Sequence, residues 1–186
     1  MKRLVVMTVG KTHSGKTTFA KELEQQLLNS VVIDQDNHAE FINTHYRALL
    51  PAEGPNTFKY SITQTILNYA IDQTDLHLIL SNSNRARSFR VNQLSFFHKK
   101  GFRSVIVNFD IPDHILQNRV AKSQRSKTIF RSASNFEEIL IRQQNESHKV
   151  EMMKPTKDEA DHFYEIKSGE ETQSVIQEIV GLTHCK

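Results

Sequence analysis

The segment that determines the expected fold is GKTHSGKT, residues 10–17. Its spacing matches the pattern G-x-x-x-x-G-K-[ST] in full. A run of β-forming residues, LVVMTV at positions 4–9, precedes it, and Phe19, Leu23 and Leu27 follow it with the four-residue spacing of a helix face. A strand, a glycine-rich loop and a helix in this order are typical of a site that binds nucleotide phosphates.

The residue types in this phosphate loop predict separate roles. Gly10 and Gly15 allow backbone N–H groups to turn inward toward phosphate oxygens, and the following helix directs its positive end at the same anion. We expect Lys16 to reach the β- and γ-phosphates and to act in catalysis, and the hydroxyl of Thr17 to bind Mg²⁺. The other positions of the segment that are predicted to contact the nucleotide are His13, Ser14 and Thr18.

Short apolar segments alternate with amphipathic segments along the rest of the chain. Because continuous apolar runs suit strands buried on both faces, this alternation predicts an α/β fold, a parallel sheet with helices on both sides. The length of 186 residues fits one domain, residues 1–186. Further strands are predicted at residues 31–33, 76–80, 105–109 and 163–166, and further helices around residues 39–42, 62–71, 91–97, 115–116 and 175–180.

The composition excludes several classes of protein. The mean hydropathy is −0.50, and no apolar run approaches the roughly 18 residues that a membrane-spanning helix needs. The single cysteine, Cys185, excludes an internal disulfide framework and a cysteine-rich zinc site, and we expect it to be an exposed bystander. The start of the sequence has no signal-peptide pattern, so we expect a cytoplasmic protein.

Charge is distributed unevenly although the net charge is only +3. Residues 85–131 contain eleven Lys or Arg against two Asp and no Glu, whereas residues 151–186 contain eight acidic against four basic residues. The basic middle of the chain predicts an anionic ligand, either nucleotide phosphates or nucleic acid. The alternative for any one of these side chains is a solvated position on a helix face.

Two aspartates, Asp34 and Asp36, directly follow the second predicted strand. Ligands of open α/β sheets bind beyond the carboxyl ends of the strands, so both carboxylates are expected at the same edge as the phosphate loop. There a carboxylate can accept the proton of an attacking hydroxyl or hold a water of the Mg²⁺ shell. Two alternatives remain: Asp36 caps the next helix, or Asp34, Asp36 and His38 form a metal site.

The third predicted strand ends at Ser81 and Asn82, where many NTPases with such a loop carry an aspartate. Mg²⁺ is therefore expected to rely on Thr17 and water, with Asp34 or Asn82 close by. Asparagine is also common in turns, so Asn82 and Asn84 are alternatively explained as loop residues.

Residues 122–134 are polar, basic and weakly periodic, which is typical of a lid over an active site. Arginine side chains match phosphate oxygens with paired hydrogen bonds. We therefore expect Arg119 to bind the nucleotide and Arg125 to stabilise charge in the transition state. For Arg131 a place on a solvated helix face explains the sequence equally well.

Together these residues resemble the small P-loop kinases related to the 5′-hydroxyl polynucleotide kinase domain, in the broader group of gluconate, shikimate and adenylate kinases. The similarity includes the phosphate loop, the aspartate after the second strand and the lid arginines. It also includes Ser83 and Asn84, where the family has a Thr-Asn pair, and residues 109–112 after the fourth strand. The chain departs from the family at Ala39, where those kinases carry a phosphate-binding arginine, and at Asn82, where they carry aspartate.

The resemblance implies a three-layer P-loop NTPase fold with five parallel strands in the order 2-3-1-4-5 and a small lid. It implies an ATP- and Mg²⁺-dependent kinase in which Asp36 activates the hydroxyl of a nucleoside, a nucleotide or a polynucleotide 5′ end. Thr17 and Asp34 are expected at the metal. The alternatives are a kinase for a sugar-type metabolite, and a regulatory or toxin-like NTP-binding module with little turnover.

Overall fold

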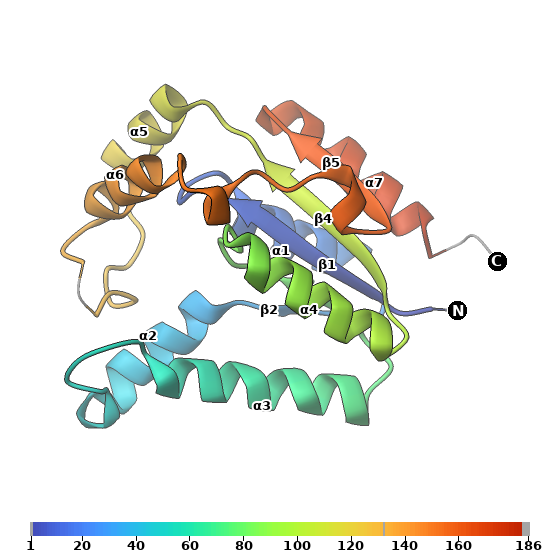
Figure 1. Cartoon of the computed structure of the whole chain (residues 1–186), viewed down its shortest axis with the longest axis horizontal. Coiled ribbons are helices and arrows are strands. Elements are labelled where there is room, and N and C mark those ends of the chain that lie inside the picture. Colours follow the sequence, from blue (N-terminus) through green and yellow to red (C-terminus); the bar gives the residue numbers. More distant parts are fainter. Residues whose placement is uncertain (1, 132, 184–186) are drawn as a thin grey trace.

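A parallel sheet of five strands in the order β2-β3-β1-β4-β5 forms the centre of the molecule (Figure 1). The computed structural model describes residues 2–131 and 133–183, so Cys185 lies outside the described residues. The observed order confirms the order that the family resemblance implied. The strands are β1 (Leu4–Gly10), β2 (Ser30–Ile33), β3 (His77–Leu80), β4 (Arg103–Phe109) and β5 (His162–Ile166).

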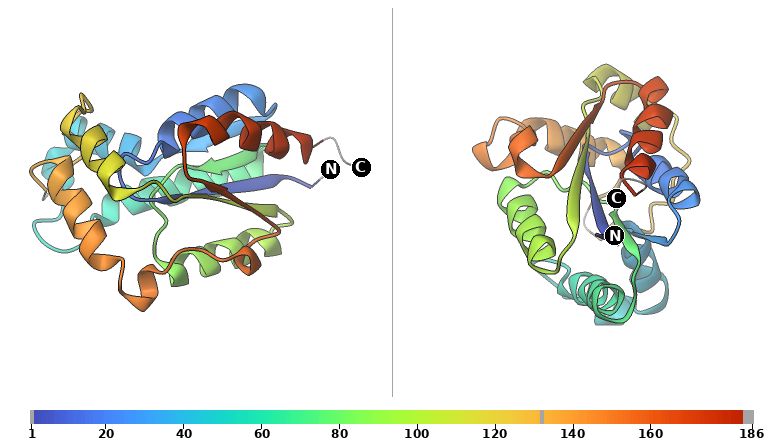
Figure 2. Two further views of the ribbon diagram at one scale, coloured as in Figure 1. Left: turned by 90° about the horizontal axis from the view of Figure 1, so that it is seen from above. Right: turned by 90° about the vertical axis from the view of Figure 1, so that its right-hand side faces the viewer.

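Helices cover both faces of this sheet, which gives the three layers that were predicted (Figure 2). Helices α1 (Lys16–Gln26) and α7 (Thr172–Gly181) pack on one face, and α3 (Thr57–Gln73) and α4 (Arg87–Lys99) pack on the other. The remaining helices are α2 (Gln35–His45), α5 (Asp113–Ala121) and α6 (Phe136–Glu146). In the part of the chain described here, no helix is both long and apolar enough to cross a membrane.

Alternation along β1 explains why one strand can support two cores. Leu4 and Val6 face the layer of α1 and α7, whereas Val5 and Met7 face the layer of α3 and α4. All four side chains are almost completely buried, as expected for a strand at the centre of a parallel sheet. Their helical neighbours include Phe19, Leu23 and Ile176 on the first face, and Leu67, Leu94 and Phe97 on the second.

Helix α6 is an element that the sequence analysis did not predict. It begins after Asn135, whose side chain accepts a hydrogen bond from the backbone N–H of Glu138 at 2.8 Å. Phe136 and Leu140 are its buried residues, spaced four apart. Together with Ile139 they have the spacing of a helix face, a periodicity that the sequence analysis overlooked. Its position matters, since it packs beside α5 and faces the phosphate loop.

Some basic residues in the middle of the chain stabilise the fold, which could not be predicted from their charge alone. Arg90 is completely buried, and its guanidinium pairs with Glu159 through Nε at 2.8 Å and Nη2 at 3.0 Å. Arg85 donates to the backbone carbonyl of Gln143 at 2.6 Å. The charge excess between residues 85 and 131 is therefore divided between structural ion pairs and the candidate site.

Candidate active site

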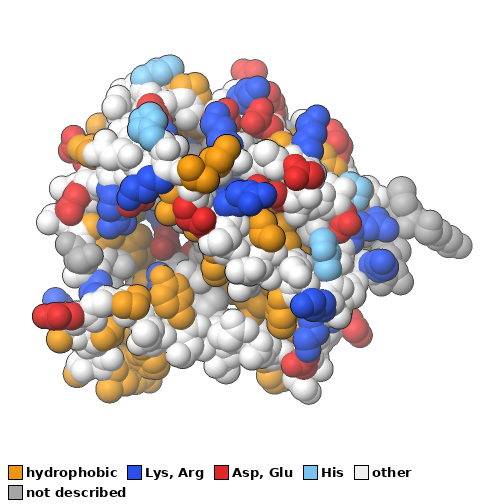
Figure 3. Space-filling model, viewed as in Figure 1, with side chains coloured by type: hydrophobic (Ala, Val, Ile, Leu, Met, Phe, Trp, Pro, Cys, Tyr) orange, Lys and Arg blue, Asp and Glu red, His pale blue; other side chains and the backbone are white. Residues whose placement is uncertain are grey.

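A cavity of about 1200 Å³ lies at the carboxyl ends of the strands, where the phosphate loop leaves β1. The space-filling view shows the molecule hollowed between the region of α5 and α6 and the region of α2, with Lys and Arg side chains beside the hollow (Figure 3). The structure gathers in this cavity most of the residues that the sequence singled out. They are His13, Ser14, Gly15, Lys16, Thr17, Thr18, Asp36, Arg119 and Arg125.

Two predicted residues, Gly10 and Asp34, lie behind the cavity wall. Gly10 has a φ of 153°, and a Cβ at this position would lie 3.0 Å from both Phe109 Cβ and Ser14 Oγ. Only glycine allows β1 to turn this tightly into the loop. Gly15, at φ 105°, ends the loop and starts α1, so both glycines shape the backbone as predicted.

The side chain of Lys16 is folded back onto its own loop. Its Nζ donates to the carbonyl oxygen of Lys11 at 2.6 Å and to Ser14 Oγ at 3.1 Å. Burial is the main cause that lowers the pKa of Lys16 to about 8; Arg125 and Arg85 also lower this pKa, while Asp36 and Asp34 raise it. The ammonium is thus held in the loop where a phosphate would bind, in surroundings that disfavour its charge until an anion arrives.

His13 connects the phosphate loop to the lid. Its Nδ1 lies 3.0 Å from Thr12 Oγ1, and its Nε2 lies 2.7 Å from Ser123 Oγ. Burial, together with the charges of Arg125, Lys16 and Arg119, lowers the pKa of His13 to about 4. The imidazole is therefore neutral at pH 7. Arg119 reaches the same residue and donates to its backbone carbonyl at 3.1 Å.

Asp34, and not Asp36, is the residue that caps α2. Its Oδ1 accepts a hydrogen bond from the backbone N–H of Asp36 at 2.8 Å, as an N-cap side chain does. The cap interpretation of Asp36 is therefore wrong. The metal site proposed from Asp34, Asp36 and His38 is not assembled either, because His38 Nδ1 bonds Thr63 Oγ1 at 2.8 Å. Within the described residues, no three His, Cys, Asp or Glu side chains form a possible metal site.

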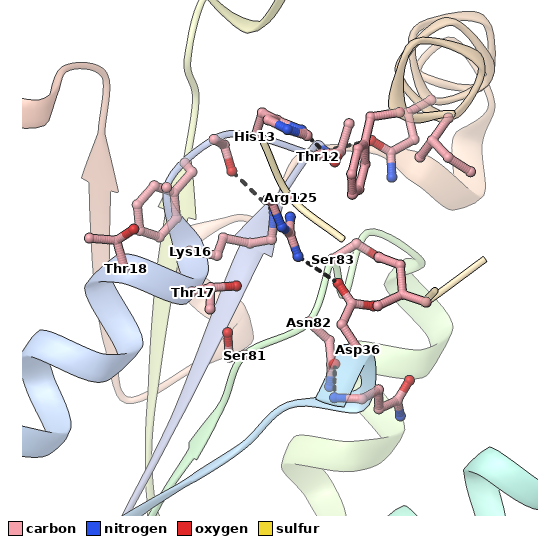
Figure 4. Close-up of a pocket in the computed structure, with 18 of the residues that line it drawn as sticks. Thr12, His13, Lys16, Thr17, Thr18, Asp36, Ser81, Asn82, Ser83 and Arg125 are labelled. Carbon is pink, nitrogen blue, oxygen red and sulfur yellow. Dashed lines mark hydrogen bonds and ion pairs between the residues drawn. The ribbon is translucent and has the colours of Figure 1, made fainter. Parts of the chain in front are cut away.

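Oxygen atoms suited to a hard cation gather below the phosphate loop. Thr17 Oγ1 donates to Asp34 Oδ2 at 3.4 Å. Ser81, at the end of β3, points toward Thr17 (Figure 4), and its buried Oγ has no hydrogen-bond partner among the described residues. Burial also raises the pKa of Asp34. A hydroxyl, a buried carboxylate and an orphaned hydroxyl fit the oxygen chemistry of Mg²⁺, so these residues suit the predicted ion.

Asp36 faces the lid across the cavity (Figure 4). Its Oδ2 accepts a hydrogen bond from Arg125 Nη2 at 3.2 Å, and both side chains are between 40 and 49% exposed. The guanidinium of Arg125 also lies over the ring of Phe136, 5.1 Å from its centre. The two predicted catalytic side chains are thus in contact, although 89 positions separate them in the sequence.

The lid reaches α2 and the loop that precedes α3. Asn43 donates through Nδ2 to the carbonyl of Thr128 at 2.5 Å, and Thr128 Oγ1 donates to Glu40 at 2.9 Å. Arg131 donates to the carbonyls of Pro51, at 3.3 Å, and Gly54. Arg131 therefore connects two loops and is not a solvated helix residue.

Asn82 and its neighbours form hydrogen bonds that hold together the segments around the site. Asn82 Oδ1 accepts from the backbone N–H of Gln35 at 3.0 Å, which fixes the start of α2 to the end of β3. Ser83 accepts through its carbonyl from the N–H of Gly10 at 3.0 Å. The buried Asn84 has a φ of 44° and donates to the carbonyl of Thr8 at 2.9 Å. The interpretation of Asn82 and Asn84 as loop residues agrees with these contacts.

Two residues of the site were missed by the sequence analysis. Gln143, on the unpredicted α6, accepts through Oε1 from the backbone N–H of Thr12 at 2.7 Å. Lys59, in the first turn of α3, lines the cavity near Asp36. Neither belongs to a motif; the packing of α6 brings Gln143 to the phosphate loop, and the packing of α3 brings Lys59 to the cavity.

The sequence and fold are similar to those of known proteins. A family model described as an AAA domain matches residues 5–150. The fold is similar to that of the Mycobacterium tuberculosis APS kinase CysC in complex with AMPPNP and APS, with a TM-score of 0.59, 17% identity and 99% of each chain covered. No curated protein matches the sequence.

Two further solved structures have the same architecture. Shikimate kinase from Bacteroides thetaiotaomicron gives a TM-score of 0.58 at 14% identity, covering 98% of this chain and 99% of that one. Chaetomium thermophilum Kti12 in complex with ADP-AlF3 gives a TM-score of 0.61 at 14% identity, and the match covers 94% of this chain and 96% of that one. At these identities the likeness concerns the fold alone. The closer relation to polynucleotide kinases stays a prediction.

Proposed function

The chain belongs to the AAA_33 family of AAA domains, and from that premise we propose that it is an ATP- and Mg²⁺-dependent kinase acting on a hydroxyl. The observation that carries the proposal is the contact between Asp36 and Arg125 at 3.2 Å, inside the cavity that Lys16 and Thr17 line. A site that only binds nucleotide does not need a carboxylate facing the transferable phosphate. A kinase needs one to accept the proton of its acceptor.

In the proposed reaction the oxygen of the acceptor hydroxyl attacks the γ-phosphorus of ATP. The hydroxyl proton passes to a carboxylate oxygen of Asp36, and the bond between the γ-phosphorus and the bridging oxygen breaks to release ADP. Lys16 and Arg125 stabilise the negative charge on the phosphoryl oxygens, where preorganised cations have their largest effect. Arg119, at the base of the lid, contacts the nucleotide.

Arg125 gives the site an order of events. Its guanidinium donates a hydrogen bond to Oδ2 of Asp36 at 3.2 Å. The γ-phosphate carries more charge than a carboxylate and competes for the guanidinium, because arginine binds phosphate with paired hydrogen bonds. When ATP binds, we expect Arg125 to move from Asp36 toward the γ-phosphate.

Thr17 and Asp34 would hold Mg²⁺, with the Ser81 hydroxyl close by. When bound, the ion neutralises charge on the β- and γ-phosphates. The chain itself keeps the ligands in place, since Asp34 is fixed through its bond to the N–H of Asp36. The acceptor is a nucleoside, a nucleotide or a polynucleotide 5′-hydroxyl, or else a sugar-type metabolite.

The test is ATP consumption against a panel of hydroxyl acceptors, with phosphorylated product identified by mass spectrometry. The panel contains 5′-hydroxyl oligonucleotides, nucleosides, nucleotides and sugars. We expect ADP formation that depends on one acceptor class and on Mg²⁺. ATP binding without acceptor-dependent turnover in the whole panel would instead favour the NTP-binding module.

A further inference from the structure

The active-site cavity continues beyond Asp36, away from the phosphate loop. Its walls there come from the loop before α3, the first turn of α3 and the end of the lid. A volume of about 1200 Å³ exceeds the 300–1000 Å³ that is typical of a pocket for one small ligand. We call this part the acceptor lobe; it is lined by Gly54, Pro55, Asn56, Lys59, Tyr60, Ile129, Phe130 and Arg131.

Lys59 is the unusual residue of the acceptor lobe. Its backbone is fixed, because its N–H donates to Asn56 Oδ1 at 3.0 Å. Its half-buried Nζ lies 5.1 Å from the ring centre of Tyr60, but it forms no ion pair or hydrogen bond within residues 2–131 and 133–183. Burial lowers the pKa of Lys59, while the charges of Asp36 and Asp34 act against that effect.

The other charged groups of the lobe already have partners. Arg131 donates to the carbonyls of Pro51 and Gly54. Asp36 accepts from Arg125. A partly desolvated ammonium without a partner is costly, and the cost falls when an anion binds beside it.

The nucleotide phosphates are an unsuitable partner for Lys59. The cations that face them come from the phosphate loop and the lid, whereas Lys59 comes from α3, which packs against α2. The contact between His38 of α2 and Thr63 of α3, at 2.8 Å, holds the starts of these two helices together, and Asp36 and Lys59 both line the cavity there. An anion bound by Lys59 therefore lies close to the hydroxyl that Asp36 would deprotonate.

We propose that the acceptor carries an anionic group, a phosphate or a carboxylate, which Lys59 binds in the acceptor lobe beside the attacking hydroxyl. This inference rests on the kinase function proposed above. It makes Lys59 a residue that selects the acceptor.

A binding experiment tests the anion site without any turnover. The protein is saturated with AMPPNP and Mg²⁺ to fill the phosphate loop and is then titrated with sulfate at constant ionic strength. Chemical shifts of ¹⁵N-labelled backbone amides at residues 56–60 are followed. We expect saturable shifts, and an affinity about tenfold or more weaker in Lys59→Gln, since a hydrogen bond to a charged group is lost.

Two matched variants control this experiment. Lys59→Arg keeps the charge and should retain most of the affinity, and Lys99→Gln removes an exposed lysine of α4 and should change nothing. The absence of saturable shifts at residues 56–60, or equal sulfate affinity in Lys59→Gln and the unchanged protein, would overturn the anion site. If Lys59→Gln does not fold, the chemical shifts of the unchanged protein and of Lys59→Arg during the sulfate titration still test the anion site.

A kinetic experiment identifies the source of the anion. Each acceptor is paired with a neutral counterpart: adenosine 3′-monophosphate with adenosine, gluconate with glucose, and shikimate with its methyl ester. We expect the anionic member of the active pair to have the higher kcat/KM, about 10- to 100-fold, and Lys59→Gln to reduce the difference through KM. Equal rates within the pair would contradict the inference. If no acceptor is phosphorylated, the kinase function fails, while the sulfate titration still decides the anion site.

Discussion

Arg125 donates a hydrogen bond to Asp36 at 3.2 Å and thereby joins the lid to the first turn of α2. The lid is thus connected to the residue proposed to act on the acceptor. Asn43 and Arg131 add contacts on the same side, to the lid backbone and to the loop before α3. We therefore expect the position of the proposed lid to influence the chemistry at Asp36.

Replacing Arg125 by alanine should loosen the lid. Both partners of the Arg125–Asp36 pair are about half-exposed, so the pair contributes modestly to overall stability, and the effect should be local. We expect faster chymotrypsin cleavage at Phe130 and faster amide exchange in residues 122–131. Chymotrypsin is chosen because the substitution would remove a trypsin site. Lys127→Ala removes a lid charge without this contact; equal acceleration in both variants would contradict a specific role of Arg125.

Nucleotide binding should be linked to proton uptake by Lys16. With a pKa of about 8, Lys16 is mostly neutral at about pH 8.5 in the free protein. The phosphates favour the charged form, so ATP binding at this pH takes up a proton, and affinity falls as pH rises through 8. Calorimetry in buffers of different ionisation enthalpy measures the uptake.

Lys16→Ala is the matched variant for that measurement. It should bind ATP without this proton uptake and should lose nearly all turnover, mainly in kcat, because Lys16 acts on charge that develops in the transition state. Turnover close to that of the unchanged protein would be incompatible with the proposed role of Lys16.

His13 should make the fold sensitive to acid. Its pKa of about 4 in the folded chain lies below the ordinary value of 6.5. Between these values the unfolded chain takes up a proton that the folded chain does not, so stability falls as pH decreases from 6.5 toward 4. We expect the Tm of His13→Asn to fall less between pH 7 and pH 4.5 than the Tm of the unchanged protein. Asparagine tolerates the φ of 59° at this position, and an identical loss of Tm in both proteins would argue against the prediction.

Asp34→Asn should change the metal requirement while it preserves the helix. Asparagine is as good an N-cap as aspartate, so the bond to the N–H of Asp36 can persist. Loss of the charge beside Thr17 should raise the Mg²⁺ concentration for half-maximal activity, by about tenfold if a charged hydrogen bond is lost. A Mg²⁺ titration of ADP binding provides a readout that does not require turnover. An unchanged Mg²⁺ midpoint would show that Asp34 serves only as the cap.

The sheet and the phosphate loop could be predicted because their signals are local. Short segments rich in apolar residues identified all five strands, and the spacing of Gly10, Gly15 and Lys16 identified the loop. Helix α6 was missed although Phe136, Ile139 and Leu140 have the spacing of a helix face, and Asn135 followed by Glu138 is a capping pattern that could have marked its start.

The missed parts of the site depend on contacts between distant segments. Gln143 reaches Thr12 only because α6 packs beside the loop, and Lys59 reaches the region of Asp36 only because α3 packs against α2. The count of basic residues also included Arg90 among possible ligand-binding residues, whereas Arg90 forms a buried ion pair with Glu159. Sequence composition shows how many charges a region carries but not which of them are neutralised by tertiary structure.

The most direct test of the account compares phosphoryl transfer by Asp36→Asn and the unchanged protein, at saturating ATP and Mg²⁺ with the acceptor found in the panel. The account predicts unchanged nucleotide affinity and a transfer rate lower by about 10²–10⁴, the usual cost of removing a general base. Asp34→Asn is the control and should transfer phosphate normally once Mg²⁺ is saturating. Normal transfer by Asp36→Asn would contradict the proposed mechanism, and its loss in Asp34→Asn alone would reverse the two roles.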